Sequence, residues 1–513
     1  MGGISLFTLG HLQSHASLWC GSLPQVDQKC GFTHTLFTRV EELLMPAQLT
    51  TRAQVNGYRF LLQRFEHALV RRDVRMLHDP MRVQFRSLMT GFVLAILVTA
   101  GCAVLAFLRP QGQVGDAKIL LGSGSGAVYV VVDKTLHPVL NLASARLITQ
   151  SDEAPTSVKD TKLTSMPRGP LLGIPGAPSA LPGPRDRDSS AWTVCEDSID
   201  GLRTTVLDGT PRLGSQVRAA AADEALLVTR DGATYLIYEG KRARVDMNSD
   251  AMVATLGLRG VRQRPVGTSL LNATVAVPDL AVPIVPGAGG PSRVRNGNFV
   301  VGTVLRVETV TGSQSYVVLA EGVQKVSEFT AELLRSADSM GHNMIPLVAP
   351  DAIGGLPVLD VLPVGQFPAK TPTVVSTDTD PIACAAWSRT GEAQAARLNV
   401  LVGRALPLDA AAAPVATVSG EGARSVYLPT GTGEFVQATG IEPDSTRRDA
   451  LFYVTDTGVR FGIPDTATAT VLGLGKPKLV PWQFIGQLPA GPMLERSAAL
   501  VARDIVRADG NVP

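Results

Sequence analysis

The longest uninterrupted apolar segment of the chain is Leu88–Leu108, which carries no charged residue and is bracketed by Arg86 and Arg109. At about 1.5 Å per helical residue it would span roughly 30 Å, the thickness of a bilayer core. Signal-peptide apolar regions are shorter and lie nearer the N-terminus. A buried core helix of this length would show a polar face, and this segment has little beyond Thr90 and Thr99. We predict one transmembrane helix, because no second segment matches it.

The charges that flank this segment predict its orientation. Eight arginines lie between residues 45 and 87, opposed by three acidic residues, whereas the next cation after Arg109 is Lys118. By the positive-inside rule the short N-terminal part is cytoplasmic and about 400 residues lie outside. The net charge of +2 hides this asymmetry and does not indicate a nucleic-acid partner. The arginines are Arg52, Arg59, Arg64, Arg71, Arg72, Arg75, Arg82 and Arg86.

Apolar residues recur at helical spacing from Thr51 onward, with arginines on the other face. The pattern ends at His78-Asp79-Pro80, because proline disfavours helix in the residue before it. A basic amphipathic helix beside a membrane either lies on anionic lipid headgroups or packs against partner subunits. The residues of the predicted docking face are Tyr58, Leu61, Leu62, Phe65, Leu69 and Met76.

Residues 1–44 differ from the rest of the chain. They hold three of the seven histidines and two cysteines, without the pattern of a signal peptide. A histidine and cysteine metal site would need paired ligand spacing, which is absent. Because Met45-Pro46 reads as an ordinary start, we interpret residues 1–44 as a disordered tail or a mis-assigned upstream start.

The outer region is rich in Val, Ala, Gly and Pro, which favours many short strands and turns. A strand–turn–strand pattern occurs four times, and glycine lies in the last three turns. Helical stretches follow the first and third copies, over 141–148 and 327–336. We interpret the copies as four related modules, with chance recurrence in a β-rich chain as the alternative. The copies are Ala127–Leu140, Ala225–Val245, Ser315–Val326 and Leu451–Ile463.

These patterns predict a β-rich α+β outer region of four modules. The proline-rich segment 166–190 is expected to be a surface loop, and 493–506 a short helix. The expected parts are an extension (1–44), the cytoplasmic helix (45–87), the membrane helix (88–108), a linker (109–126), module 1 with the proline-rich loop (127–190), an intervening segment (191–218), module 2 (219–300), module 3 (301–365), a second intervening segment (366–430), module 4 (431–480) and a C-terminal segment (481–513).

Two cysteines, Cys195 and Cys384, lie in the outer, oxidising compartment, where a disulfide is favoured over a metal site. Their surroundings, Trp192-Thr-Val-Cys195 and Cys384-Ala-Ala-Trp387, mirror each other, so we expect each sulfur to pack beside an indole. A bridge over this separation could stabilise the fold by up to about 5 kcal/mol. Two separate buried thiols are the alternative.

The residues of the outer region do not form a catalytic constellation. His137 and His342 are its only histidines, which excludes a histidine-rich metal site and leaves little for a catalytic triad. No GxxxxGK[ST] loop occurs, and Gly240-Lys241 and Gly475-Lys476 lack its other residues. We therefore predict no catalytic or metal-binding residues, no cofactor, and a structural or binding role.

Several motifs occur together and in order, and they resemble the EccB family of type VII (ESX) secretion systems of mycobacteria and other actinobacteria. The resemblance begins near Leu49 and extends to the end of the chain. The motifs are Thr51-Arg-x-Gln-Val-x-Gly-Tyr-Arg-Phe60, Arg71-Arg-Asp-x-Arg-Met76, Arg109-Pro-Gln-Gly112, Leu136-His-Pro-Val-x-Asn-Leu-x-Ser-Ala-Arg-Leu147, Gly173-Ile-Pro-Gly-Ala-Pro178, the Trp-x-x-Cys and Cys-x-x-Trp pair, Pro481-Trp482 and Gly491-Pro492.

The resemblance implies a single-pass inner-membrane subunit that assembles with EccC, EccD and EccE, self-associates, and supports export of Esx (WXG100), PE and PPE proteins. It also implies four periplasmic repeat modules around a central domain closed by a disulfide, here Cys195–Cys384. The first part of this central domain would be 191–218 and the second part 366–430. Family repeats resemble phage cell-wall-binding modules, so peptidoglycan is an alternative partner beside the lipid bilayer. Some members are named ATPases, which makes ATP and Mg²⁺ possible ligands by name only, since EccC is the recognised motor.

Overall fold

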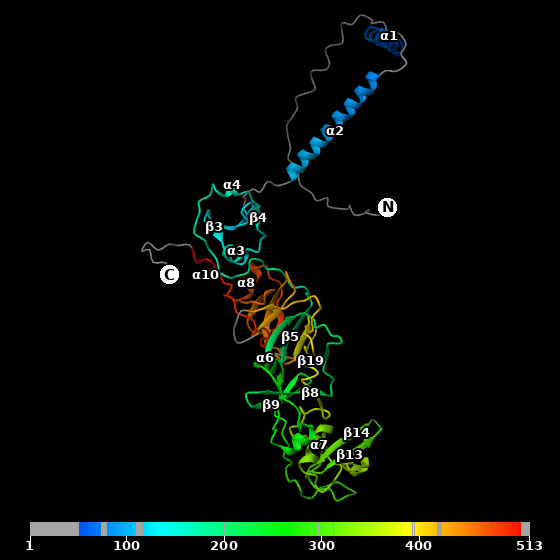
Figure 1. Ribbon diagram of the computed structural model, residues 1–513, viewed down its shortest axis with the longest axis vertical. Helices are drawn as coiled ribbons and strands as arrows, with labels where there is room; N and C mark the ends of the chain where they lie inside the picture. The colour runs from blue at the N-terminus through cyan, green and yellow to red at the C-terminus, as the bar shows by residue number, and fades with distance from the viewer. Residues whose placement is uncertain are drawn as a thin grey trace, which may run out of the picture. The chain divides into compact units, whose positions relative to one another are not determined.

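The computed structural model describes residues 51–72, 80–108, 116–199, 201–295, 297–310, 312–391, 393, 395–417 and 423–503. The chain divides into two compact units, Met1–Arg109 and Pro110–Pro513 (Figure 1). Each unit is described by itself. The predicted N-terminal extension, residues 1–44, lies outside the described residues.

The first helix, α1 (Arg52–Arg71), is the predicted basic amphipathic helix. At its start, the side-chain oxygen of Gln54 accepts a hydrogen bond from the backbone N–H of Thr51 at 3.1 Å. It ends earlier than the sequence pattern predicts, because Arg72 takes a left-handed conformation with φ of 55°. Met76, predicted for the docking face, lies outside the described residues.

The second helix, α2 (Pro80–Leu108), contains the predicted membrane segment. It starts at a proline, which is favourable at the first helical position because its missing N–H would have no partner there. The basic segment before residue 88 therefore continues the same helix. Its stretch Gln84–Leu105 has a mean hydropathy of 2.4 and is the one described helix long and apolar enough to cross a membrane.

The second unit contains five β-sheets, and four of them share one topology. In each of the four, three antiparallel strands are followed by a helix and then by a strand parallel to the first. The four sheets, with their helices, are sheet A (β1 Ile119–Gly122, β2 Val128–Val132, β3 Thr135–Val139, α3 Leu142–Thr149, β4 Thr156–Val158), sheet B (β8 Glu224–Arg230, β9 Ala233–Tyr238, β10 Lys241–Arg244, α5 Asp250–Thr255, β11 Arg264–Pro265), sheet C (β13 Val304–Thr309, β14 Gly312–Val318, β15 Val323–Val326, α7 Glu328–Ala337, β16 Leu347–Val348) and sheet D (β22 Gly433–Thr439, β23 Leu451–Thr455, β24 Arg460–Ile463, α8 Thr466–Val471, β25 Lys478–Pro481).

The helix that follows the third strand starts in the same way in all four sheets. Asn141, Ser249, Ser327 and Asp465 are the N-cap residues, and each accepts a hydrogen bond from the backbone N–H three residues later. Such caps satisfy one of the N–H groups that a helix start leaves without a partner. Local sequence thus ends the third strand and begins the helix at equivalent points.

The sequence patterns found part of each sheet. The segments 127–140, 315–326 and 451–463 contain the second and third strands of sheets A, C and D, and 225–245 contains the first three strands of sheet B. The first strand of sheet A lies inside the predicted linker 109–126, which is therefore shorter than expected. Helices follow the third strand in all four sheets and not only in the two predicted cases.

The segment after each fourth strand returns to the third strand of its own sheet. In sheet A, the proline-rich segment 166–190 forms parallel bridges from Arg168 and Leu172 to β3. Val358 and Ala490 form the corresponding bridges in sheets C and D, and β12 (Val275–Ala276) pairs with β10 in sheet B. The predicted surface loop therefore contributes edge bridges before β5 begins.

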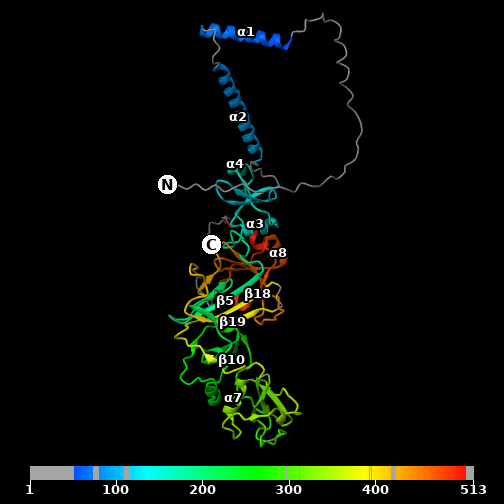
Figure 2. The ribbon, with the colours of Figure 1, turned by 90° about the vertical axis from the view of Figure 1, so that its right-hand side faces the viewer.

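The fifth sheet, called the central sheet, has seven strands in the order β20-β21-β6-β5-β18-β19-β7. One of its faces shares a hydrophobic cluster with sheets B and D. Sheet D shares a second cluster with sheet A, and sheet B shares a third with α7 of sheet C. Figures 1 and 2 follow the same order, with β5 and β19 between α8 and the strands of sheet B. The strands are β5 Ser189–Asp197, β6 Arg203–Asp208, β7 Val217–Ala219, β18 Ile382–Thr390, β19 Arg397–Gly403, β20 Val415–Ala416 and β21 Ser425–Tyr427.

Short elements complete the second unit. They are α4 (Asp160–Leu163), α6 (Thr268–Asn272), the 3₁₀ turn η1 (Pro350–Ala352), β17 (Thr373–Val374, which pairs with β8), α9 (Trp482–Ile485) and α10 (Arg496–Ala499). The predicted helix over 493–506 is wrong in length, because α10 has four residues. The chain then turns extended, and Ala502 bridges to Leu172 beside sheet A.

Two glycines in sheet B provide a matched test of the packing between this sheet and the central sheet. Gly232 and Gly240 occupy equivalent hairpin turns with φ of 77° and 75°. A Cβ atom added at Gly232 would have no heavy atom within 4 Å other than those of the glycine and its chain neighbours. A Cβ atom added at Gly240 would lie 2.8 Å from the backbone oxygen of Leu398 in β19.

We expect Gly232→Ala to destabilise the protein by about 1–2 kcal/mol, the cost of a left-handed alanine. Gly240→Ala should cost clearly more, because it adds a clash with the central sheet. The melting temperature of the detergent-solubilised chain measures both. Equal losses would show that the two sheets do not approach each other at this turn.

Candidate functional site

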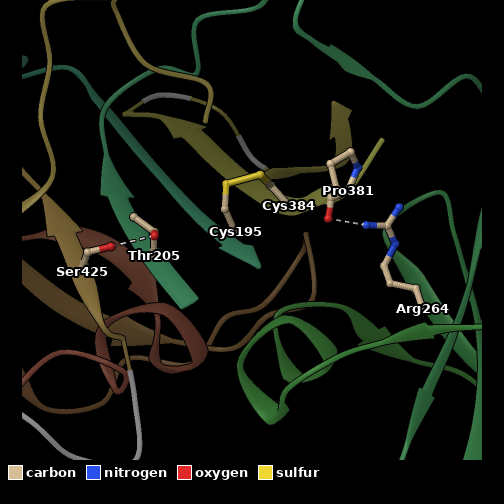
Figure 3. Close-up of a disulfide and its surroundings, with 6 residues drawn as sticks. All are labelled: Cys195, Thr205, Arg264, Pro381, Cys384 and Ser425. Atoms are coloured by element: carbon tan, nitrogen blue, oxygen red, sulfur yellow. Dashed lines mark hydrogen bonds between the residues drawn. A yellow bond between two sulfur atoms is a disulfide. The ribbon is translucent and has the colours of Figure 1, made fainter. Parts of the chain in front are cut away.

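The strands β5 and β18 lie side by side at the middle of the central sheet and run antiparallel. Their register puts Cys195 opposite Cys384 and Trp192 opposite Trp387. The two cysteines form a disulfide with a Cα–Cα distance of 4.0 Å, which Figure 3 shows across the two strands. The predicted disulfide is therefore present, and it links residues far apart in the chain.

The expected packing of each sulfur beside an indole is wrong. Successive side chains of a strand point to opposite faces, so residues three apart, such as Trp192 and Cys195, face opposite sides. Both indoles belong to the cluster shared with sheets B and D. Both cysteines belong to a separate cluster on the other face, with Leu207 and Leu401. The two tryptophans therefore lie together on one face of the sheet, and the two cysteines lie together on the other.

Hydrogen bonds join the central sheet to its neighbours near the disulfide (Figure 3). Arg264 of sheet B is 2% exposed and donates to the carbonyl oxygens of Asp380 and Pro381, just before β18. Burial lowers the pKa of Arg264 to about 10, so it remains charged at neutral pH. Within the central sheet itself, the hydroxyls of Thr205 in β6 and Ser425 in the adjacent strand β21 lie 2.8 Å apart.

Glu196 in β5 also contacts the segment that follows sheet B. It is 2% exposed and accepts hydrogen bonds from the backbone N–H groups of Gly267 and Leu270, at 2.7 and 3.0 Å. Burial raises the pKa of this carboxyl, and the two N–H groups oppose that rise. A side chain at Gly267 would collide with the carboxylate, so glycine is required by close approach.

A cavity of about 410 Å³ opens where the central sheet, sheet D and the proline-rich segment meet. At its inner end Lys478 and Glu434 form an ion pair of 2.5 Å, with side chains 13% and 3% exposed. The lining residues are Arg185, Asp186, Ser189, Ala191, Thr193, Leu207, Asp208, Gly209, Thr210, Pro211, Arg212, Pro407, Leu408, Asp409, Tyr427, Pro429, Glu434 and Lys478.

The cavity contains an unusual concentration of carboxylates. Burial raises the pKa of Glu434, and Lys478 opposes that rise. Burial and the nearby Glu434 raise the pKa of Asp208, to about 8. At the rim, Asp186 accepts hydrogen bonds from Ser189 and backbone N–H groups, which lower its pKa.

The cavity cluster was not found from the sequence. Asp208 ends β6, Glu434 lies in β22, and Lys478 begins β25, so the three residues come from distant parts of the chain. Charged residues at strand ends are ordinarily solvated, and their sequence neighbours carry no recognisable motif. Only the contact between two sheets brings them together.

The described residues do not contain a recognisable phosphate or metal site. No group of three His, Cys, Asp or Glu side chains within them could hold a metal ion. Gly240-Lys241 forms a hairpin turn between β9 and β10, and Gly475-Lys476 precedes β25. Neither pair leads into a helix N-terminus, where backbone N–H groups could bind phosphate.

The two outer histidines lie apart in the chain, His137 in β3 of sheet A and His342 in the segment between α7 and β16 of sheet C. His137 in β3 contacts the carbonyl oxygen of Pro170 through Nδ1 at 3.1 Å. A Cβ on Gly169 would overlap its ring, so the histidine fills a space that glycine leaves. His342 stacks at a tilted angle on Phe299, with ring centroids 5.7 Å apart.

The predicted docking face of α1 is exposed in the first unit. Phe65 and Leu69 are 71% and 75% exposed, and Tyr58, Leu61 and Leu62 are exposed as well. An apolar surface that extends over about three helical turns is unfavourable in water.

Comparisons with known proteins give one consistent result. The sequence model of the family described as "Type VII secretion system ESX-1, transport TM domain B" matches residues 47–508. The chain is 38% identical to the ESX-3 secretion system ATPase EccB3 of Mycolicibacterium smegmatis over 90% of this chain and 92% of that protein. It is 36% identical to the ESX-5 secretion system ATPase EccB5 of Mycobacterium tuberculosis over 90% and 95%.

Solved structures agree with the sequence comparisons. A chain of an intact ESX-5 inner membrane complex matches with a TM-score of 0.68 and 35% identity, over 91% of this chain and 98% of that one. A chain of an EccB3 dimer from the ESX-3 core complex matches with a TM-score of 0.67 and 35% identity, over 75% and 100%.

Removal of the disulfide tests its contribution to the second unit. We expect Cys195→Ala/Cys384→Ala to reduce stability by about 2–5 kcal/mol, because the open chain gains conformational entropy when unfolded. Alanine is preferred to serine, since a hydroxyl in this apolar cluster would lack a partner. The melting temperature of the outer unit measures the loss. Cys102→Ala in α2 is the control, and an equal melting temperature for all three proteins would contradict the prediction.

Proposed function

The chain belongs to the EccB family of type VII secretion proteins, and from this premise we propose that it is a structural core subunit of an ESX inner membrane complex. In this role it supports the export of Esx, PE and PPE proteins without carrying out chemistry itself. The observation that carries the proposal is one described helix of membrane length, which lies in the sequence between an amphipathic helix with an exposed apolar face and a large β-rich unit. Each of these parts offers a surface for assembly.

The cytoplasmic docking surface in this proposal is the apolar face of α1. Its five described residues are all more than half exposed, while arginines occupy other faces of the same helix. An anionic lipid surface would use the arginines, whereas a protein partner would cover the apolar side chains. We favour EccC and EccD as the partners, with EccE in the same complex.

The orientation follows from the flanking charges. Arginines concentrate before α2, so the N-terminal side is cytoplasmic and the unit after residue 110 is periplasmic. The periplasmic assembly of the ESX-5 complex, whose chain is 35% identical with a TM-score of 0.66, supports this orientation.

The periplasmic unit consists, in this proposal, of four repeats of one module around a central domain. The shared strand order of sheets A to D and the equivalent helix caps support common descent. In this proposal the disulfide closes the central domain, and β1 is added to module 1. The dimer formed by the relative EccB3 supports self-association of this unit.

ATP hydrolysis is the second candidate function, because the relatives are named ATPases. Such an activity needs ligands for Mg²⁺ and a cationic clamp on the phosphates. In the described residues the cavity of the central sheet unites carboxylates with Lys478. Its lysine is already committed to Glu434, however, so we rank this function second.

A triple substitution tests the docking surface. We expect Leu61→Ala/Phe65→Ala/Leu69→Ala to abolish co-purification with EccC and EccD, because it removes the apolar contact area while keeping the helix. Asn56→Ala/Gln63→Ala/His67→Ala, on another face of α1, is the matched control. Native gels of the membrane complex measure assembly. An intact complex with the apolar variant would overturn the docking proposal.

The ATPase alternative has a direct test. We expect the purified full chain to hydrolyse ATP no faster than a mock purification, across a titration of Mg²⁺. The comparison protein is Glu434→Gln, which removes the buried carboxylate nearest Lys478. Turnover that is present in the parent chain and absent in this variant would place a nucleotide site in the cavity and reverse the ranking of the two functions.

A further inference from the structure

Three segments that are distant in the chain meet around one buried cation. Lys478 of β25 makes its ion pair with Glu434 of β22 and also donates to the backbone oxygens of Asp186 and Ser189, at 2.9 and 3.1 Å. The last two residues lie where the proline-rich segment enters β5. Lys478 therefore ties sheet D to the entry of the central sheet.

Three oxygens already surround the ammonium group of Lys478. One belongs to the ion pair with Glu434, and two are backbone oxygens that accept hydrogen bonds. The ion pair with Glu434 is neutral as a whole. Asp208 enters the same cavity from β6 and is 9% exposed. An ionised Asp208 would thus add a buried negative charge beside Glu434 without a cation of its own.

We propose that Asp208 is uncharged in the folded protein at neutral pH, and that loss of its proton in mildly alkaline conditions loosens the junction between the central sheet, sheet D and the proline-rich segment. The junction is thereby sensitive to pH. The physical cause is repulsion between two carboxylates that share one lysine in a place with little water.

The other charged groups of the cavity lie nearer its mouth. Arg212 and Asp409 pair with each other at 3.3 Å, and their side chains are 67% and 65% exposed, so water screens them. Asp186 keeps its charge because Ser189 holds its pKa low, and it adds to the repulsion. Arg185 and the hydroxyl of Tyr427 complete the titratable lining.

The direction of the pH effect follows from the two states of Asp208. In the unfolded chain its pKa is ordinary, near 3.8, whereas in the folded chain burial and Glu434 raise it to about 8. The stability that the proton confers is complete below pH 4 and declines as pH rises to 8. Above pH 8 both states have lost the proton, and stability levels off at its lowest value.

The segments tied by Lys478 should respond first. Tyr453 of β23 donates to the carbonyl oxygen of Pro182 at 2.9 Å, which gives the proline-rich segment a second attachment to sheet D. Lys478 lines the cavity from sheet D, and Asp208 lines it from β6 of the central sheet. Opening of the cavity would therefore separate sheet D from β6 while each sheet keeps its own ladder.

Hydrogen exchange of the full chain, corrected for the intrinsic pH dependence of exchange, tests the proposal. Protection in β6, β22 and β25 should fall by about tenfold per pH unit between pH 6.5 and 8 and then level off, since one proton is released on opening. Protection in α7 of sheet C, away from the cavity, should stay constant. Equal behaviour of α7 and the three strands would overturn the proposal without any variant.

A pair of isosteric substitutions provides the second test. Asp208→Asn removes the titrating group and should abolish the pH dependence while raising protection at pH 8. Asp409→Asn, which lines the same cavity but is exposed, should keep the parent behaviour. If Asp208→Asn retains the tenfold decline, or Asp409→Asn removes it, Asp208 is not the group responsible.

Discussion

The pairing of β5 with β18 is the contact on which the outer unit depends. Their register puts cysteine opposite cysteine and tryptophan opposite tryptophan. A slip of one residue would send the indoles to the face of the sulfurs, because side chains alternate along a strand. The indole face is the one that sheets B and D cover. A single covalent bond therefore keeps the register that decides where two neighbouring sheets can pack.

The same module topology serves different neighbours at its four positions. In sheets B and C the helices α5 and α7 pack against each other, whereas α3 of sheet A packs against α8 and α10. Each of these helices is capped by one residue next to it in the sequence, so the cap does not depend on which sheets lie around the module. Contacts between sheets instead depend on particular close approaches, such as that of Gly240 to Leu398. The local sequence therefore determines the topology of each module, and a few close contacts determine how the module packs against the neighbouring sheets.

This division explains what could be predicted from the sequence. The membrane helix follows from composition, the disulfide from compartment and cysteine count, and the second and third strands from a tight turn between apolar runs. The first and fourth strands have weaker signals, since β1 is four residues long and β4 three. The prediction that each indole packs beside a sulfur is wrong, because residues three apart in a strand face opposite sides of the sheet. The cavity of Asp208 was unpredictable, because its charges meet only when two sheets dock.

A buried ion pair contributes little net stability, because desolvation offsets most of the attraction between its charges. We therefore infer that the ion pair of Lys478 and Glu434 contributes mainly to the specific geometry of this junction. Lys478 uses three directional donors to hold sheet D and the entry of β5 at fixed positions, which an apolar side chain of similar size could not do. In our proposal, these contacts of Lys478 weaken when the nearby carboxyl of Asp208 loses its proton. For a component of an inner membrane complex, this junction holds two sheets in a defined geometry and lets that geometry respond to a single proton.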